Sequence, residues 1–426
     1  MDNISYISDN YMCSNCGACE YVCPKNAISF RSSSMGRIYA TVSADCVNCG
    51  LCNKVCPSVD ELQLHKRYDK PLVGEIKGVY VGRSTDDKLF SNSQSGGAAS
   101  AIISFLLDNK IIDAALVCVI CEGGNPHGEA QIITRSSEIA KSQKSCYTPV
   151  TLLTALKEAK EFNRIAIVGL PCQIEAVTLL CEQKKLTNII YKIGLICDRM
   201  LCDTITDVMM SISHFKSGKI DWRRKAFTYK NRFYPYKTAP VVVHNIKETR
   251  VIPNSYRFSL KEMFTPLRCR VCYDKLNTHS DITLGDPWGM SNVDWERGAS
   301  LVITRNEKGN QLICDIEEAR ILDISPRTIQ EVLQGQQIDK RLEQINMCSS
   351  IIGSIANPSA SFLLSSEKSF NKDIVFEFLN KEIHNFVELE GLSKSDIIKI
   401  AKKKVRHDIF MSKLASIKSV IKKIVR

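Results

Sequence analysis

The chain has 426 residues, 44% of them hydrophobic and 24% charged, which is typical of a folded protein of two or three domains and excludes a disordered or fibrous chain. Its 19 cysteines are too sparse for a disulfide scaffold in a chain of this length, and its first residues show no secretory signal. No apolar run is long enough to predict a membrane-spanning helix. We therefore expect a cytoplasmic protein whose thiols bind metals or take part in catalysis.

The positive charge is concentrated at the C-terminal end. Of the net charge of +11, nine charges come from residues 394–426, which contain 11 Lys or Arg and two Asp. The rest of the chain is close to neutral. The basicity is therefore a property of the tail and does not indicate nucleic-acid binding.

Residues 1–60 contain the motif Cys-x-x-Cys-x-x-Cys-x-x-x-Cys-Pro twice. Three cysteines of one tight loop bind one [4Fe-4S] cluster, and the fourth binds the other cluster, as in two-cluster ferredoxins. The predicted ligands are Cys13, Cys16, Cys19 and Cys56 for one cluster, and Cys46, Cys49, Cys52 and Cys23 for the other. Zinc sites normally use two-plus-two spacing. The motif therefore predicts a ferredoxin-type domain through which electrons pass.

A polar linker over 61–75 precedes a body in which strand and helix patterns alternate. Strands are predicted at 78–83, 114–120, 164–170, 188–197 and 300–306. Helices are predicted within 93–109, at 151–162 and 171–185, near 201–215 and at 309–319. This alternation favours an α/β layer with a mainly parallel sheet. We divide the body into 76–165 and 166–345, with an antiparallel insertion over the aromatic segment 220–253.

Residues 346–426 are predicted to form a helical region with a basic amphipathic tail. Five apolar residues of the tail are spaced three or four apart and would form one stripe: Phe410, Leu414, Ile417, Ile421 and Ile424. Such a stripe can lie on an anionic membrane or pack on the body or a partner subunit. Packing on the body is the favoured alternative.

Four segments of the body together resemble the beta subunit of coenzyme F420-reducing hydrogenases and dehydrogenases. They are SNSQSGGAASAII at 91–103, VGLPCQIEAV at 168–177, IGLICD at 193–198 and FTPLRCRVCYDKLNTHSDITLGDPWG at 264–289. The resemblance implies a small bacterial-type ferredoxin domain (α+β), an α/β flavin-binding body and a helical C-terminal tail. Cys146 stands where the family commonly has Lys, which puts one contact to flavin or substrate in doubt.

The resemblance implies an FAD site in the body. Small residues at a helix start let backbone amides approach a pyrophosphate. The candidate cofactor residues are Ser93, Gln94, Ser95, Gly96, Gly97, Gly169, Gln173 and Asp286. A strand that ends at Gly169 would place Cys172 and Gln173 at the carboxyl edge of the sheet, where ligands bind.

Four body cysteines at the family positions are candidates for a third [4Fe-4S] cluster: Cys172, Cys197, Cys269 and Cys272. Two alternatives remain open, because a cysteine at a strand end is often a small buried side chain and a Cys-x-x-Cys pair can be half of a zinc site. Cys118 and Cys121 lie within an apolar strand pattern, which favours core packing. None of the seven His is assigned to a metal.

The leading hypothesis is an iron–sulfur flavoprotein oxidoreductase. Electrons pass between the clusters and FAD, and on to or from a two-electron substrate such as a deazaflavin or another small molecule. Its partners are a redox protein or a soluble electron carrier. The alternatives are an electron-transfer subunit without its own substrate, and a scaffold whose body cysteines are merely buried.

Overall fold

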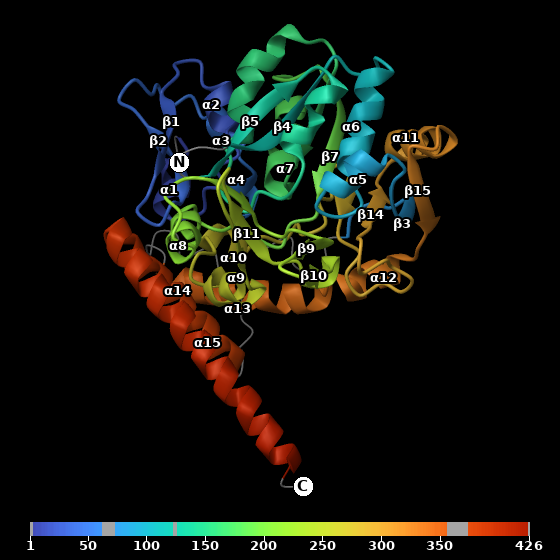
Figure 1. Ribbon diagram of the computed structural model, residues 1–426. Coiled ribbons are helices and arrows are strands. Elements are labelled where there is room, and N and C mark those ends of the chain that lie inside the picture. Colours follow the sequence, from blue (N-terminus) through green and yellow to red (C-terminus); the bar gives the residue numbers. More distant parts are fainter. Residues whose placement is uncertain (1–2, 62–72, 122–125, 356–373, 425–426) are drawn as a thin grey trace.

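The computed structural model describes residues 3–61, 73–121, 126–355 and 374–424. Figure 1 shows an N-terminal part beside a layered body, with long C-terminal helices along the lower side. Most of the predicted linker, 61–75, lies outside the described residues.

The N-terminal part contains a two-stranded antiparallel hairpin and four short helices. Its elements are α1 (Ser5–Asp9), α2 (Ala18–Val22), β1 (Ile28–Ser32), β2 (Ile38–Val42), α3 (Leu51–Lys54) and α4 (Pro57–Glu61). Helices α2 and α3 begin after Gly17 and Gly50, the equivalent glycines of the two motifs. The sequence repeat is therefore also a structural repeat.

The body is built on one eight-stranded sheet of order β15-β3-β14-β13-β7-β6-β4-β5. Its strands are β3 (Gly78–Ser84), β4 (Ala114–Cys121), β5 (His127–Ile133), β6 (Ile165–Gly169), β7 (Ile189–Leu195), β13 (Ile282–Gly285), β14 (Ser300–Thr304) and β15 (Leu322–Pro326). The four central strands pair with one another as parallel strands, in the order β13, β7, β6 and β4. The other four pairings are antiparallel.

The expectation of a mainly parallel sheet was therefore wrong. Too few residues separate β4 from β5 for the helical crossover that a parallel neighbour requires, so the two pair as antiparallel strands. The segment between β13 and β14, which the structure describes throughout, likewise contains no helix, and these strands are also antiparallel. The sheet is mixed, with a parallel centre.

Helices cover both faces of this sheet. The helical segments of the body are α5 (Asp87–Asn92), α6 (Ala98–Asp108), η2 (Ser136–Ser142), η3 (Leu152–Glu161), α7 (Pro171–Glu182), α8 (Thr204–Ile212) and α11 (Glu307–Glu318). Successive strand residues point to opposite faces, so Val117 packs in the core with α6 and α11, whereas Leu116 packs with η3 and α7. The helix predicted at 151–162 is a 3₁₀ helix.

The predicted insertion is antiparallel, as expected. It contains β8 (Lys219–Asp221), β9 (Phe227–Tyr229), β10 (Arg232–Tyr234), η4 (Tyr236–Thr238), β11 (Val241–His244) and β12 (Thr249–Ile252). Strands β12, β11 and β8 form one small sheet, and β9 and β10 form a hairpin. Two short helices follow, α9 (Asn254–Lys261) and α10 (Leu267–Arg270).

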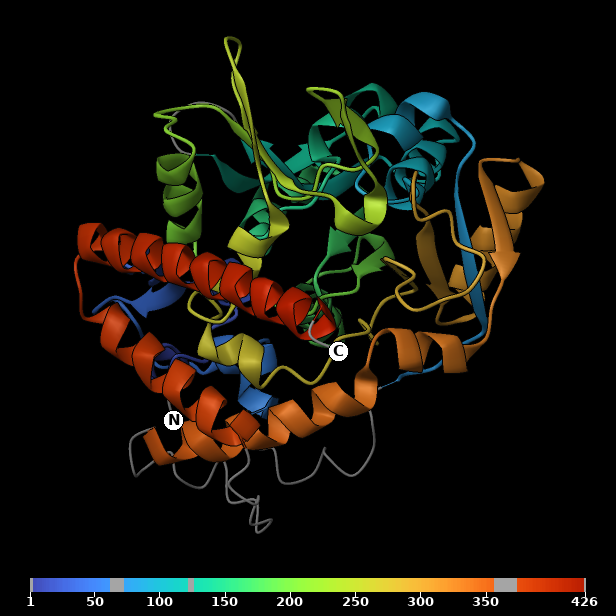
Figure 2. The same cartoon turned by 60° about the horizontal axis from the view of Figure 1, so that its bottom comes forward.

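Four helices form the C-terminal region: α12 (Ile329–Gly335), α13 (Ile338–Ile355), α14 (Ile374–Glu390) and α15 (Lys394–Ile424). The first half of α15 packs against α8 and α9 through Ile397, Ala401 and Val405, which are buried. Figure 1 shows the second half of α15 extending away from the rest of the molecule toward the C-terminus, and Figure 2 shows the same helix in a second view. Within the described residues, no helix is both long and apolar enough to span a bilayer.

Of the predicted stripe, the two residues whose side chains are described, Phe410 and Leu414, do not pack on the body. Phe410 is 60% exposed and Leu414 is 36% exposed. The side chains of Ile417, Ile421 and Ile424 lie outside the described residues. The helix is present as expected, but its buried face lies nearer its N-terminus.

Candidate functional site

Four thiols of the N-terminal part converge. Burial raises the pKa of Cys19 well above its usual value, and the charges of Cys16, Cys13 and Cys56 raise it further. Burial also raises the pKa of Cys56, again with contributions from Cys16 and Cys13. Cys56 is therefore an electrostatic neighbour of the cysteines of the first loop, and Cys52 of the other motif also contributes to the raised pKa of Cys19.

The other four N-terminal cysteines line one hollow near the surface: Cys23, Cys46, Cys49 and Cys52. Cys49 is exposed, whereas Cys52 is buried. The fourth cysteine of each motif therefore lies with the first three of the other motif.

The two cysteine loops have the same backbone conformation. Four residues have positive φ: Asn15 at 49°, Gly17 at 99°, Asn48 at 51° and Gly50 at 71°. In each loop the Asn amide donates to the sulfur of the first cysteine, Cys13 or Cys46, at 3.4 Å. These turns curl the chain around a centre, and amide donors suit sulfurs that bind an iron cluster. The residues therefore fit the two [4Fe-4S] clusters.

The structure also brings together the four candidate cysteines of the body. Cys172 lies in the first turn of α7, directly beyond β6, and Cys197 lies just beyond β7. Cys172 interacts electrostatically with Cys272 and Cys197, and Cys197 interacts with Cys269 and Cys272. Burial is the largest cause of the raised pKa of both thiols. Two strand ends and the α10 segment therefore supply one group of four thiols.

Two arginines surround this group. Arg341 donates to the carbonyl oxygens of Cys269 at 2.5 Å and Cys272 at 3.2 Å. The Arg341 charge lowers the pKa of Cys197, and the Arg268 charge lowers that of Cys172, against the opposing effect of burial. The charges of the two arginines therefore offset part of the effect of burial on the pKa of Cys172 and Cys197. The group is therefore suited to bind an iron cluster or another thiophilic metal.

The N-terminal helices α2 and α4 contact α7, the helix that carries Cys172. Cys16 contributes to the raised pKa of Cys172, so the two sulfur groups are electrostatic neighbours. Beside them, Nε of Arg268 donates to Oγ of Ser58 at 3.0 Å, which joins α10 to α4. The N-terminal part and the body therefore share a buried, thiol-lined boundary.

The small-residue loop at 93–97 is held tightly against the sheet. The Gly96 amide donates to Oγ of Ser300 at 3.1 Å, and its carbonyl accepts from the Ser84 amide at 2.8 Å. A Cβ on Gly96 would lie 2.4 Å from the Ser300 nitrogen and 2.5 Å from the Gly82 oxygen. Glycine is required here by two strand backbones. The Gly96 amide that was expected to face an anion is already bonded within the chain.

Side chains of the insertion bind the same loop. Lys225 donates to Oγ of Ser93 at 3.2 Å and also to the Ser95 carbonyl. Gln94 donates to the Arg223 carbonyl at 2.5 Å. Burial lowers the pKa of Lys225 to about 7. The loop and the insertion therefore form one site.

Asp286 joins this site from the end of β13. Its carboxylate accepts from Arg223 and from the Tyr236 hydroxyl, each at 2.5 Å. The rings of Tyr236 and Trp288 stack with centroids 5.8 Å apart, and Trp295 stacks on Trp288 at 5.5 Å. The buried guanidinium of Arg223 therefore lies between the Asp286 carboxylate and the ring of Trp288.

No local sequence pattern marks Arg223, Lys225, Tyr236 or Trp295 as residues of this site. The only signal was the aromatic richness of 220–253, together with the Gly-Asp-Pro-Trp-Gly segment. Their approach to the 93–97 loop depends on contacts between distant parts of the chain, which no local pattern reveals.

Gln173 and Gly169 lie at the carboxyl edge of the sheet as expected, but both are engaged within the chain. Gln173 accepts from the Leu170 amide at 2.9 Å and donates to the Val150 carbonyl at 3.1 Å. The Gly169 carbonyl accepts from Asn277 at 3.0 Å. These bonds fix the turn that carries Cys172. In this arrangement the two residues position the cysteine rather than face a ligand.

Comparison with protein families assigns most of the chain. Residues 79–157 match the model for the N-terminal part of the coenzyme F420 hydrogenase/dehydrogenase beta subunit, and residues 162–329 match the model for its C-terminal part. Residues 12–59 match a 4Fe-4S dicluster domain.

Similar proteins come from Methanosarcina and Methanococcus species. The chain is 28% identical over 304 residues to one of the subunits of the F(420)H(2) dehydrogenase of Methanosarcina mazei, covering 68% of this chain and 80% of the relative. It is 24% identical to the beta subunit of the coenzyme F420 hydrogenase of Methanococcus voltae, covering 63% and 90%. The same fold occurs in a chain of the F420-reducing [NiFe] hydrogenase complex from Methanosarcina barkeri, whose structure was solved as a xenon derivative. The two chains superimpose with a TM-score of 0.52 and are 18% identical, and the match covers 66% of this chain and 93% of that one.

Proposed function

The chain belongs to the coenzyme F420 hydrogenase/dehydrogenase beta-subunit family, and we propose that it is an iron–sulfur flavoprotein oxidoreductase. The observation that carries the proposal is the packing of α2 and α4 against α7, which makes Cys16 an electrostatic neighbour of Cys172. It joins the thiols of a dicluster domain to a second thiol group at the carboxyl edge of the body sheet.

In the proposed protein, the first cluster is held by Cys13, Cys16, Cys19 and Cys56, the second by Cys23, Cys46, Cys49 and Cys52, and the third by Cys172, Cys197, Cys269 and Cys272. Such clusters, when bound, exchange single electrons. The chain sets their environment: Asn15 and Asn48 donate to ligand sulfurs, and Arg268 and Arg341 place positive charge beside the third group.

The FAD site is proposed where the 93–97 loop, Arg223, Lys225 and Asp286 meet. Nη2 of Arg223 is buried and has no hydrogen-bond partner in the described residues, which leaves a donor for a phosphate oxygen. When bound, the flavin would convert one-electron steps into a two-electron transfer. Lys225 holds the loop through Ser93 and Ser95, and the Trp288 stack closes the site on its apolar side.

The proposed substrate is a two-electron acceptor or donor, such as a deazaflavin or another small molecule. The names of the relatives support the deazaflavin coenzyme F420. The second candidate is an electron-transfer subunit that serves a partner enzyme. Cys49 favours it, because its exposure leaves the second thiol set open to a docking protein or soluble carrier.

A second contact surface is the free end of α15. Phe410 and Leu414 are exposed on a helix whose segment carries most of the net charge. This end would contact the partner subunit or, alternatively, an anionic membrane.

The experiment is anaerobic reconstitution of the full chain, followed by iron, sulfide and flavin analysis and by assay with an artificial electron donor. We expect iron and FAD in the purified chain and reduction of a deazaflavin. Bound cofactors without turnover of any small molecule would favour the electron-transfer subunit. Iron without flavin would overturn the flavoprotein proposal.

A further inference from the structure

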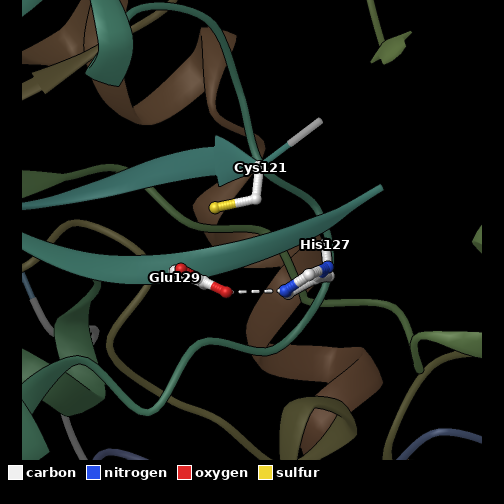
Figure 3. Close-up of side chains that lie close together, drawn as sticks. All are labelled: Cys121, His127 and Glu129. Carbon is white, nitrogen blue, oxygen red and sulfur yellow. Dashed lines mark hydrogen bonds and ion pairs between the residues drawn. The ribbon is translucent and has the colours of Figure 1, made fainter. Parts of the chain in front are cut away.

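One group of metal-binding side chains lies outside all the cluster thiols. Cys121 is the last residue of β4, and His127 and Glu129 lie in the first part of β5. Figure 3 shows their side chains gathered at the end of this strand pair. The sequence pattern favours core packing for Cys121, and the scattered His residues show no spacing typical of metal ligands.

The strand register explains why the three meet. Cys121 pairs directly with His127 across the two antiparallel strands, and such opposite residues point to the same face. Glu129 follows His127 by two positions, and residues two apart in a strand share a face. One face of the strand pair therefore presents a thiol, an imidazole and a carboxylate.

The opposite face is held by Gly128. A Cβ there would lie 2.4 Å from Cγ2 of Val150 and 2.6 Å from Sγ of Cys146. The backbone between His127 and Glu129 is thus pressed against the loop before η3. This packing fixes the direction in which the two side chains point.

The ligand atoms are close enough to share one ion. One ligand atom from each residue lies within 4.8 Å of the other two. His127 and Glu129 are hydrogen-bonded at 2.7 Å, shown by the dashed line in Figure 3. Around a tetrahedral ion, ligand atoms lie roughly 3.3–3.6 Å apart, so this pair needs to open by less than about 1 Å.

We propose that Cys121, His127 and Glu129 form a zinc site. Sulfur, nitrogen and oxygen ligands in one tetrahedral set match Zn²⁺, whereas Mg²⁺ and Ca²⁺ prefer oxygen alone. Three protein ligands leave a fourth position for water or a substrate atom. The His127 and Glu129 side chains are 48% and 55% exposed, which gives an ion access from solvent.

The site lies at the end of β4, at the carboxyl edge that also carries Cys172 beyond β6. It shares no residue with the proposed clusters or flavin site. Cys121 and His127 form the last residue pair of β4 and β5. An ion bound there would link the two strands through their side chains at the end of the strand pair. The proposal therefore does not depend on the proposed redox function.

The test measures zinc in the full chain with its iron clusters in place, so that the cluster thiols are already occupied. Protein is loaded with zinc and then challenged with a chromophoric chelator of known affinity. We expect one zinc more in the wild type than in Cys121→Ser or His127→Ala, with a loss of affinity of at least about tenfold in each. Glu129→Gln, which preserves shape, should weaken binding as well.

The matched controls are Cys314→Ser and His384→Ala, which change an exposed cysteine on α11 and an exposed histidine on α14. Iron content and thermal unfolding check that every variant is folded. Zinc absorption spectra should show one sulfur near 2.3 Å and lighter atoms near 2.0–2.1 Å. Equal zinc in wild type and Cys121→Ser, or the same loss in a control, would mean that the residues form an ion pair only and would overturn the proposal.

Discussion

Cys16 of the first cysteine loop and Cys172 of the first turn of α7 are electrostatic neighbours across the boundary between the N-terminal part and the body. Ser58 and Arg268 are hydrogen-bonded at the same boundary. In the proposed function, a route for electrons across this boundary would lead from the first N-terminal thiol set to the thiol group of the body. The exposed Cys49 lies in the other N-terminal set, which would make that set the outer end of such a route.

The iron content of the protein should depend on the body cysteines. Three four-iron clusters require about twelve irons per chain. Cys269→Ser combined with Cys272→Ser should reduce this to about eight, measured by iron and sulfide assay after anaerobic reconstitution. Cys314→Ser is the control, because this exposed thiol belongs to none of the three groups. Equal iron in the double variant and the wild type would remove the third cluster.

Substitution of Gly96 should affect stability and flavin content together. A Cβ there meets the backbones of Ser300 and Gly82, which cannot move aside as a flexible side chain could. Gly96→Ala should cost about 1–3 kcal/mol in the free energy of unfolding and lower the flavin absorbance. Gly391→Ala is the control, since its Cβ would meet only the Glu388 oxygen at 3.4 Å. Full flavin occupancy in Gly96→Ala would place the flavin elsewhere.

Lys225 should make stability depend on pH. Burial lowers its pKa from 10.5 to about 7, so between these values the unfolded chain holds a proton that the folded chain has lost. Stability should therefore rise with pH across this window, by at most about 1.4 kcal/mol per pH unit. Urea unfolding at pH 7 and pH 9 should give a smaller rise in Lys225→Met than in the wild type.

Lys237→Met is the matched control, because Lys237 belongs to the same insertion and lies over the Trp295 ring. It should keep the pH dependence of the wild type. Identical pH dependence in the wild type and Lys225→Met would show that Lys225 carries the same protonation in both states.

The two halves of α15 should respond differently to a new charge. Val405 is buried, whereas Phe410 is 60% exposed. Val405→Asp should lower the thermal unfolding temperature because it buries an unpaired carboxylate, and Phe410→Asp should leave it unchanged. The same drop in both variants would mean that Phe410 is covered in solution.

The membrane alternative for the tail has its own measurement. If the free end of α15 contacts an anionic surface, the full chain should co-sediment with anionic vesicles and not with neutral ones, and salt should weaken this binding. Phe410→Asp combined with Leu414→Asp should abolish it. If the protein binds neither kind of vesicle, the free end of α15 does not contact a membrane, and a protein partner is the remaining candidate.

The sequence predicted best those features that are local. Two-residue spacers between cysteines, with Asn and Gly at the equivalent positions, give the same turns in both loops. The strand, turn and helix around Gly169 and Pro171 were likewise predicted, because Pro at the first helical position is a strong start signal. The placement of Cys172 at the sheet edge follows from that local pattern.

Contacts between distant parts of the chain could not be predicted from the sequence. The need for glycine at position 96 was attributed to a pyrophosphate, but the nearest atoms belong to Ser300 and Gly82. Lys225 reaches the 93–97 loop from a separate insertion. Cys121 meets His127 only because of a register that a periodic pattern does not determine. In each case the missing information was which distant segment lies opposite.

The position of β3 has a consequence for how the chain is made. This first strand of the body lies between β14 and β15, pairing with Leu301 on one side and Ile324 on the other. During synthesis its residues leave the ribosome long before either neighbour exists, with both edges unpaired. The matched N-terminal family region therefore cannot complete its sheet alone, and completion waits until about residue 326 has been translated. We expect slow, late folding and a need for chaperones in the interval.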